Sequence, residues 1–425
     1  MAAIGGLKTI SMATHDTGTI ENTQVEPALR RRLTLPLLVL YGLGVTIGAG
    51  IYVLVGLTAG EAGIHAPVSF LLAAAIVAFS GLTYAELSTR YPVSAGEAVF
   101  VDKAFVMPWL TLLVGLAIAL SGLVSAATVT IGAAAYLQQL VHLPSVLLIV
   151  IIVLGLGALA VWGILESVIV AAVFTLLEVG GLIFVVGYAM TAHPGLVLRL
   201  GELVPPLDLA VWSGITSGAL IAFFAFIGFE DLVNVAEEAQ APHRNMPRAI
   251  LYTLGISTLV YLAVASVIVL TVPLDALRES AAPLTLVFAE DADLARSGLA
   301  LIAGIATLNG ILIQLIMASR VLYGLADRGR LPRILAHIHP KTRTPIVATG
   351  LTIGATLLFS LLLPVQSLAQ LTSGIILSVF AIVNLSLIRI RAKAGEPAGD
   401  LFRVPIWVPW AGLFACLALL ATSLL

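Results

Sequence analysis

Long apolar runs dominate this sequence and restrict its fold more than any other feature. We count eleven runs long enough to cross a hydrocarbon core as helices, which takes about 20 residues. The chain is 60% hydrophobic and only 10% charged, where soluble proteins carry about 25% charge. Because backbone groups in lipid must be paired internally, we predict an all-α polytopic membrane protein. The runs fall at 35–57, 67–88, 104–138, 145–164, 166–190, 209–236, 248–272, 297–325, 345–363, 366–388 and 404–425.

The distribution of basic residues orients these runs. Of the 21 Lys and Arg residues, 18 fall on one predicted side, and only Arg199, Arg278 and Arg296 fall on the other. Cytoplasmic loops carry the excess of positive charge, so the N-terminus is predicted to be cytoplasmic. The polar segment 1–33 contains no cleavable signal and is predicted to be a cytoplasmic tail. We expect a multi-pass protein of the plasma (inner) membrane, surrounded by lipid.

Several classes of function find no support in the sequence. The net charge is −2 and basic tracts are absent, so we expect no nucleic acid partner. A single cysteine, Cys416, excludes an internal disulfide. Neither a zinc-protease nor a serine-hydrolase motif occurs in the runs, and there is no phosphate-binding loop. We therefore predict no enzyme activity, no cofactor and no metal site, which leaves carriers and channels.

Two of the runs are interrupted by glycine. The first contains "GVTIGAGIYV" (44–53), and the sixth contains "AFFAFIGFEDLV" (222–233). The interruptions are five runs apart, and because five is odd the second set of five is inverted in the membrane. Paired interruptions in inverted halves are typical of a transporter binding site. We therefore divide the chain into repeat 1 (34–190), repeat 2 (208–388) and a last helix (403–425).

An unwound segment inside a membrane needs partners for its backbone. Backbone N–H groups freed near Gly48, Ala49 and Gly50 suit a carboxylate, because they would lie at a half-helix N-terminus. Carbonyls freed near Gly228 suit an ammonium group. Together the two breaks could hold an α-amino acid by its charged ends. Close helix packing through Gly44 and Gly48 is the alternative explanation of the first motif.

Four long motifs occur in an order that resembles the amino acid–polyamine–organocation (APC) superfamily. They are "GVTIGAGIYVLVG", "LTYAELSTRYPVSAGEAVFV", "FFAFIGFEDLVNVAEEAQAPHRNMPRAI" and "ASRVLYGLADRGRLPRILAHIHPKTRTP". The chain looks most similar to prokaryotic permeases near the cationic amino acid transporters. The resemblance implies a LeuT-type 5+5 inverted repeat, helices 1 and 6 unwound at the midplane, and alternating access. Members usually have twelve spans, and we count about eleven.

The same resemblance assigns a substrate site. It implies backbone contacts to the substrate at 47–50, an aromatic lid at Phe224 and a carbonyl ligand at Ile227. Some relatives bind an ancillary subunit through a loop cysteine, and because the loop "QQLVHLPS" has none, we expect no disulfide-linked partner. The complete expected site comprises Thr46, Ile47, Gly48, Ala49, Gly50, Phe224, Phe226, Ile227 and Gly228.

Glu178 is a charge near the middle of run 166–190. Such a residue costs about 2.5–3.5 kcal/mol at the bilayer centre and faces a cavity or a partner. In proton-coupled relatives a Lys stands at this position, whereas a carboxylate can accept a proton or bind a cation. We predict proton coupling through Glu178, with Glu230 and Ser319 as further coupling residues. The alternative is that Glu178 and Glu230 only accept hydrogen bonds.

Proton-coupled symport of an amino acid is therefore our principal prediction. An amino acid or amine exchanger is the alternative, and a sodium-coupled carrier or a channel is more remote. The substrate remains open at this point. Phe224, Phe226 and Ile227 favour a neutral side chain, whereas Glu178 or Glu230 would favour a cationic one.

Overall fold

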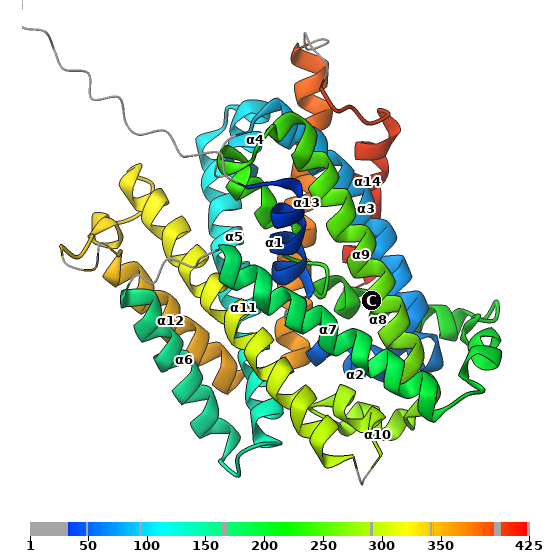
Figure 1. Cartoon of the computed structure of the whole chain (residues 1–425). Helices are drawn as coiled ribbons and strands as arrows, with labels where there is room; N and C mark the ends of the chain where they lie inside the picture. The colour runs from blue at the N-terminus through cyan, green and yellow to red at the C-terminus, as the bar shows by residue number, and fades with distance from the viewer. Residues whose placement is uncertain are drawn as a thin grey trace, which may run out of the picture.

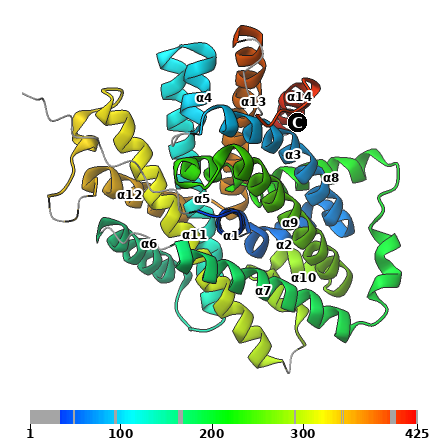
Figure 2. The same ribbon diagram turned by 45° about the horizontal axis from the view of Figure 1, so that its top comes forward.

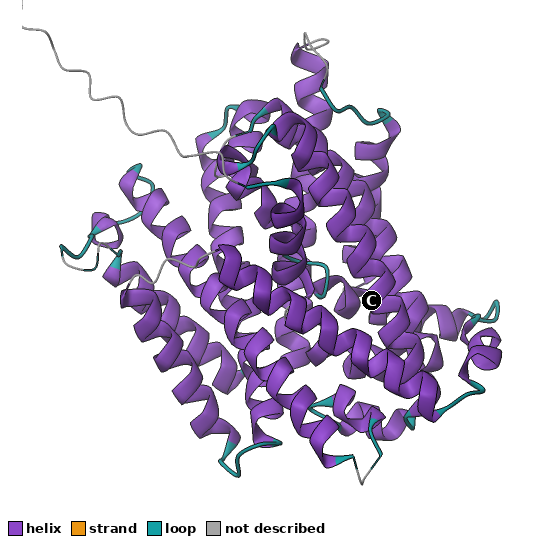
Figure 3. Ribbon diagram, viewed as in Figure 1, coloured by secondary structure: helices purple, strands orange, loops and turns teal. Residues whose placement is uncertain are grey.

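The computed structural model describes residues 33–47, 50–92, 96–162, 168–289, 292–340, 342, 344–394 and 401–422, and these residues are almost entirely helical (Figure 3). The first part of the chain forms α1 (Leu35–Ile47), α2 (Gly50–Ala62), η1 (Gly63–His65), α3 (Ala66–Arg90), α4 (Gly96–Phe105), α5 (Pro108–Gln138), α6 (Ser145–Trp162), α7 (Val168–Ala192) and η2 (Leu196–Leu203). The second part forms α8 (Leu209–Phe224), η3 (Phe229–Glu238), α9 (Pro242–Thr271), α10 (Leu274–Glu279), η4 (Pro283–Val287), α11 (Asp293–Asp327), η5 (Arg333–Ala336), α12 (Ile346–Leu362), α13 (Val365–Ala394) and α14 (Trp407–Thr422).

The predicted all-α polytopic class is confirmed. Within the described residues, seven helical stretches are long and apolar enough to cross a membrane. Four shorter apolar helices, of 10–17 residues, correspond to α1, α6, α12 and α14. Leu33 and Ala239 form an isolated parallel β-bridge.

The predicted run 104–138 begins too early. Residues 104 and 105 end the separate helix α4, and α5 begins only at Pro108. The residue before a proline is disfavoured in the helical conformation, and Met107 is extended, with φ −117° and ψ 101°. Proline at the first position of a helix then starts α5, where its missing N–H leaves no partner unsatisfied.

Helices that are five predicted runs apart pack against each other. Contacts join α2 with α8, α3 with α9, α5 with α11, and α6 with α12. Figure 1 shows α6 and α12 together at one edge of the bundle, with α3, α9 and α14 at the opposite edge. The turned view of Figure 2 places α1 at the centre, where it contacts α7, α9 and η3.

The connections predicted to share the cytoplasmic side lie together at one end of the bundle. The backbone N–H of Gln240 donates to the carbonyl of Leu33 at 2.9 Å. The ammonium of Lys393, at the end of α13, donates to the carbonyl of Ala104 in α4 at 2.9 Å. The first contact joins the segment before α1 to the connection before α9, and the second joins α4 to the end of α13; both pairs lie in the upper part of Figure 1.

Glu86 of α3 is the centre of a buried ion-pair cluster at this same end. Its side chain is 0% exposed and accepts hydrogen bonds from the guanidinium of Arg90, at 2.7 Å, and from that of Arg391 in α13. Its second carboxylate oxygen also accepts the backbone N–H of Val404 at 2.9 Å. One carboxylate therefore joins α3, α13 and the segment that leads into α14.

We predict that Glu86→Gln destabilises the fold. Two guanidinium groups would lose their counter-charge in a buried place, and breaking a buried pair costs about 3–5 kcal/mol. Thermal unfolding in detergent should show a clearly lowered midpoint. The control is Glu202→Gln, because Glu202 pairs with Arg199 on the surface, where a pair contributes about 0–1 kcal/mol. Equal unfolding midpoints for both variants would contradict a stabilising role of the ion-pair cluster around Glu86.

Candidate functional site

The two helix breaks meet in space. A Cβ atom on Gly50, the first residue of α2, would lie 2.8 Å from the Cβ atom of Ala225, which follows α8. Gly228 has φ +121°, a conformation that other residues rarely adopt, and a Cβ atom there would lie 2.8 Å from the carbonyl oxygen of Val45. Each break thus packs against the backbone of the other. Gly44, by contrast, packs against the side chain of Thr175 in α7, as the helix-packing alternative predicts.

Tyr261 of α9 holds the two breaks together. Its hydroxyl lies 2.8 Å from the carbonyl oxygen of Thr46 and 2.6 Å from that of Ala225, so the two acceptors share its single proton. The side chain is fully buried, and its ring meets Phe226 edge-on at 5.0 Å. One phenol therefore serves a carbonyl at the end of α1 and another at the end of α8.

A small cavity lies between the breaks, α5 and α11. Its volume is about 30 Å³, which is room for about two water molecules. We call it the break cavity, and it is lined by Val45, Thr46, Gly50, Ser125, Val129, Phe224, Ile227, Gly310, Ile313 and Gln314. The hydroxyl oxygen of Thr46 and the side-chain carbonyl oxygen of Gln314 are buried here and have no hydrogen-bond partner within the part of the chain that the structure describes. The site is thus mainly apolar, with two polar groups free to bind a ligand.

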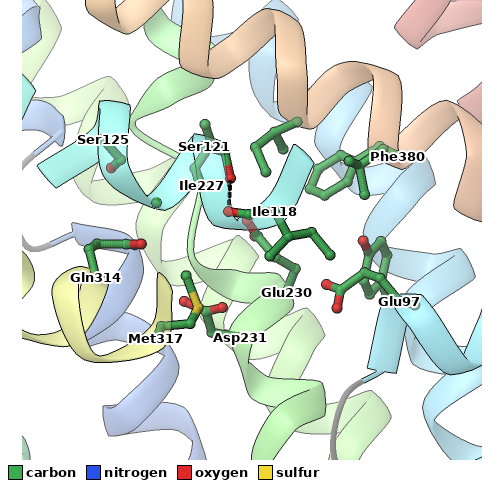
Figure 4. A pocket seen from close by; sticks show the side chains of 14 residues that line it. Glu97, Ile118, Ser121, Ser125, Ile227, Glu230, Asp231, Gln314, Met317 and Phe380 are labelled. Carbon is green, nitrogen blue, oxygen red and sulfur yellow. Dashed lines mark hydrogen bonds between the residues drawn. The ribbon is translucent and has the colours of Figure 1, made fainter. Parts of the chain in front are cut away.

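A second cavity, of about 20 Å³, shares Ser125, Ile227 and Gln314 with the break cavity. We call it the acidic cavity because Glu97, Glu230 and Asp231 all line it (Figure 4). Glu97 comes from the first turn of α4, and the other two residues come from the first turn of η3. Its remaining lining residues are Tyr84, Ile118, Ser121, Gly122, Met317, Ile376, Val379 and Phe380.

Glu230 has a structural contact at the break of the sixth run. One of its carboxylate oxygens accepts the backbone N–H of Gly228 at 2.8 Å. It therefore satisfies a donor that the interrupted helix leaves free. This contact agrees with the hydrogen-bonding alternative, while the position of Glu230 in the acidic cavity leaves room for a second role.

The structure brings together only part of the substrate site expected from sequence. Thr46, Gly50, Phe224 and Ile227 line the break cavity, whereas Gly48 and Ala49 lie outside the described residues. The other predicted residues do not line it. Ile47 and Phe226 are buried in the hydrophobic core, Gly228 packs on Val45, and the Ser319 hydroxyl donates to the carbonyl of Ile316 on its own helix.

Glu178 lies in α7, apart from the lining of both cavities. It is 1% exposed, and among the described residues its two carboxylate oxygens have no hydrogen-bond partner. Its backbone carbonyl accepts the hydroxyl of Tyr52 at 2.7 Å, and the carbonyl of Tyr52 in turn accepts the hydroxyl of Tyr136. The carboxylate therefore makes none of the helix–helix hydrogen bonds that a purely structural role would require.

Sequence reasoning did not place Tyr261, Ser125, Gln314 or Glu97 in the site. A glutamine inside an apolar run is a signal that could have identified Gln314. Glu97 follows a Gly in one of the quoted motifs, but nothing local indicates that the start of its helix lies against Val233 of η3. Tyr261 carries no signal, because its partners are backbone atoms distant in sequence.

These observations define a helical polytopic membrane protein with a buried site where two interrupted helices meet. Residues 33–425 match the amino acid permease family. The chain belongs to this family, and the predicted membership of the APC superfamily is confirmed.

The curated relatives include bacterial, plant and animal transporters. The chain is 28% identical to the branched-chain amino acid permease BcaP of Bacillus subtilis, over 94% of this chain and 90% of that protein. It is 32% identical to the vacuolar cationic amino acid transporter 2 of Arabidopsis thaliana, over 85% of this chain and 60% of that protein. It is 29% identical to the human cationic amino acid transporter 4, over 89% of this chain and 62% of that protein. The chain thus spans less than two thirds of these two cationic transporters.

We predict that Tyr261→Phe weakens both stability and transport. The variant leaves the carbonyls of Thr46 and Ala225 without their donor, and a buried unsatisfied group costs about 1–3 kcal/mol. Thermal unfolding in detergent and uptake into proteoliposomes should both decline. Tyr188→Phe is a suitable control, because Tyr188 accepts a hydrogen bond at the partly exposed end of α7. Unchanged uptake by Tyr261→Phe would contradict the bridging role.

The free energy of unfolding should depend on pH through Glu97. Burial raises the pKa of this carboxyl from 4.5 to about 7. The folded state therefore binds a proton that the unfolded state loses, and stability declines as pH rises from about 4.5 to 7. The loss is on the order of 3 kcal/mol. Unfolding midpoints between pH 5 and 8 should decline less steeply for Glu97→Gln, and an equal decline would contradict this role.

Proposed function

We propose that this protein is a secondary active transporter that moves amino acids across the plasma membrane by alternating access, with its N-terminus in the cytoplasm. The observation that carries the proposal is the meeting of two helix breaks around a buried cavity. Backbone groups freed at such breaks can bind both charged ends of an amino acid. The relatives named for branched-chain and cationic amino acids support this substrate class.

We propose a LeuT-type 5+5 inverted repeat, formed by the segments 34–190 and 208–388. The helix pairs α3 with α9, α5 with α11, and α6 with α12 support it, because each pairs equivalent runs of the two sets. The broken helices α1–α2 and α8–η3 form the fourth such pair. A pseudo-symmetric pair of halves gives the site two surfaces that can move relative to each other.

Alternating access requires the break cavity to change size. At about 30 Å³ it is smaller than any amino acid. Phe224 and Ile227 border it from the break of the sixth run, so their displacement would admit a substrate. An apolar wall with a few oriented polar groups is the usual composition of a small-molecule site.

We propose that a proton is the coupling ion and that Glu178 carries it. An ionised carboxylate at this depth needs a partner, and the Glu178 oxygens accept no hydrogen bond from any residue that the structure describes. A protonated carboxyl is the form that suits such a place. Its link to the site runs through Tyr52 of α2, the helix whose first residue, Gly50, borders the break cavity.

Uptake into proteoliposomes tests this function. We expect one group of labelled amino acids to accumulate when an inward proton gradient is applied. Uptake that requires amino acid inside the vesicles would instead establish an exchanger and remove the coupling role of Glu178. Failure to transport any amino acid under either condition would contradict the proposal.

We predict that Glu178→Gln abolishes the proton dependence of uptake. The amide keeps the shape of the side chain but cannot exchange a proton. Initial rates across pH 5.5–8 should become nearly flat in the variant, while Glu202→Gln, an exposed carboxylate outside the bundle, keeps the normal profile. An unchanged profile in Glu178→Gln would show that the proton binds elsewhere.

A further inference from the structure

The acidic cavity contains more negative charge than its surroundings balance. Glu97, Glu230 and Asp231 are 5%, 6% and 7% exposed, and the described residues that line the cavity include no Lys or Arg. The Gly228 N–H satisfies one oxygen of Glu230. Buried carboxylates without a counter-charge are costly, so this cavity favours a ligand that brings positive charge.

A second polar group points to a hydrogen-bond donor as the ligand. The side-chain oxygen of Gln314 is buried with no hydrogen-bond partner among the described residues, and the residue is only 9% exposed. Figure 4 shows Gln314 and Glu97 extending toward the cavity from opposite sides, with Glu230 and Asp231 between them. An ammonium or guanidinium group has donors and no acceptors, which matches a cavity of acceptors.

The position of the acidic cavity relates it to the substrate. Ser125, Ile227 and Gln314 line both cavities, so the two are neighbours across a shared wall. A substrate whose α-carbon groups occupy the break cavity could pass its side chain beside Ile227 into the acidic cavity. The aliphatic stem would then contact apolar residues while its end reaches the carboxylates.

We propose that the acidic cavity, through Glu97, Asp231 and Gln314, is the subsite for the cationic side-chain end of a basic amino acid. This inference deepens the proposed function and rests on it. Glu97 sets this subsite apart from the break cavity, because it belongs to α4 and not to either of the two broken helices.

Protons compete with the substrate cation for this subsite. Burial disfavours the charged form of a carboxyl, so a proton and a cation are alternative ways to neutralise these groups. The titratable groups that face the cavity are Glu97 from α4, Glu230 and Asp231 from η3, and Tyr84 from α3, while the lining residues of α5, α11 and α13 are uncharged. A cationic side chain should displace a proton, so basic substrates should bind better as pH rises.

The test compares lysine with norleucine, which has the same carbon chain without the ammonium group. Uptake of both is measured in proteoliposomes containing the wild type, Glu97→Gln or Asp231→Asn. The matched control is Asp102→Asn, an exposed carboxylate on the same helix α4. We expect lysine uptake to fall at least about tenfold in Glu97→Gln, with norleucine uptake within about twofold of the wild type.

The outcomes separate the subsite from the transport function. Preferential loss of lysine uptake in Glu97→Gln and Asp231→Asn, with Asp102→Asn unaffected, supports the subsite. Norleucine transport with no lysine transport by the wild type overturns the subsite and leaves the transport function in place. Parallel loss of both substrates in Glu97→Gln also overturns it, because a structural role would not distinguish them. If the wild type transports neither lysine nor norleucine, nor any other amino acid on the panel, the proposed amino acid transport is contradicted.

Discussion

Backbone polar groups cannot be left unpaired inside a membrane, and this constraint shapes the centre of the molecule. Two interrupted helices expose N–H and carbonyl groups at the same depth, at several kcal/mol for each unpaired group. Side chains that lie beside the breaks in space pair with some of these groups. The single hydroxyl proton of Tyr261 is shared by a carbonyl at each break, and Glu230 accepts the N–H of Gly228. Close contact at Gly50 and Gly228 then leaves a small space between the breaks, which is the candidate substrate site.

The buried acids fall into groups with different surroundings. Glu86 is fully paired with Arg90, Arg391 and a backbone N–H, and it joins helices at one end of the bundle. Glu178 makes no side-chain hydrogen bond within the described parts of the chain, which suits a residue that changes its protonation state. Glu97 and Asp231 share a cavity beside the break cavity. The partners of each carboxylate, and not its burial alone, therefore distinguish a structural role from coupling or recognition.

Much of the fold could be predicted from the sequence, because helix length and apolarity are local properties. The runs, their glycine breaks and the family followed from patterns within a few dozen residues. The start of α5 was misplaced because the chain is interrupted before Pro108, which begins a new helix, while hydropathy continues across this point. The contacts of Tyr261, Gln314 and Glu97 could not be predicted, since they depend on which helices pack together across long separations. Ile47 and Phe226 sit in the expected segments but face the core.

The central claim is that an amino acid is held by backbone groups where the two breaks meet. A structure of the protein with a transported amino acid bound tests it most directly. The account predicts the α-carboxylate at the N-terminal end of α2 beside Gly50, the α-amino group against the carbonyls between Phe224 and Gly228, and Phe224 over the substrate. An amino acid bound away from both breaks, with the break cavity unchanged, would contradict the account.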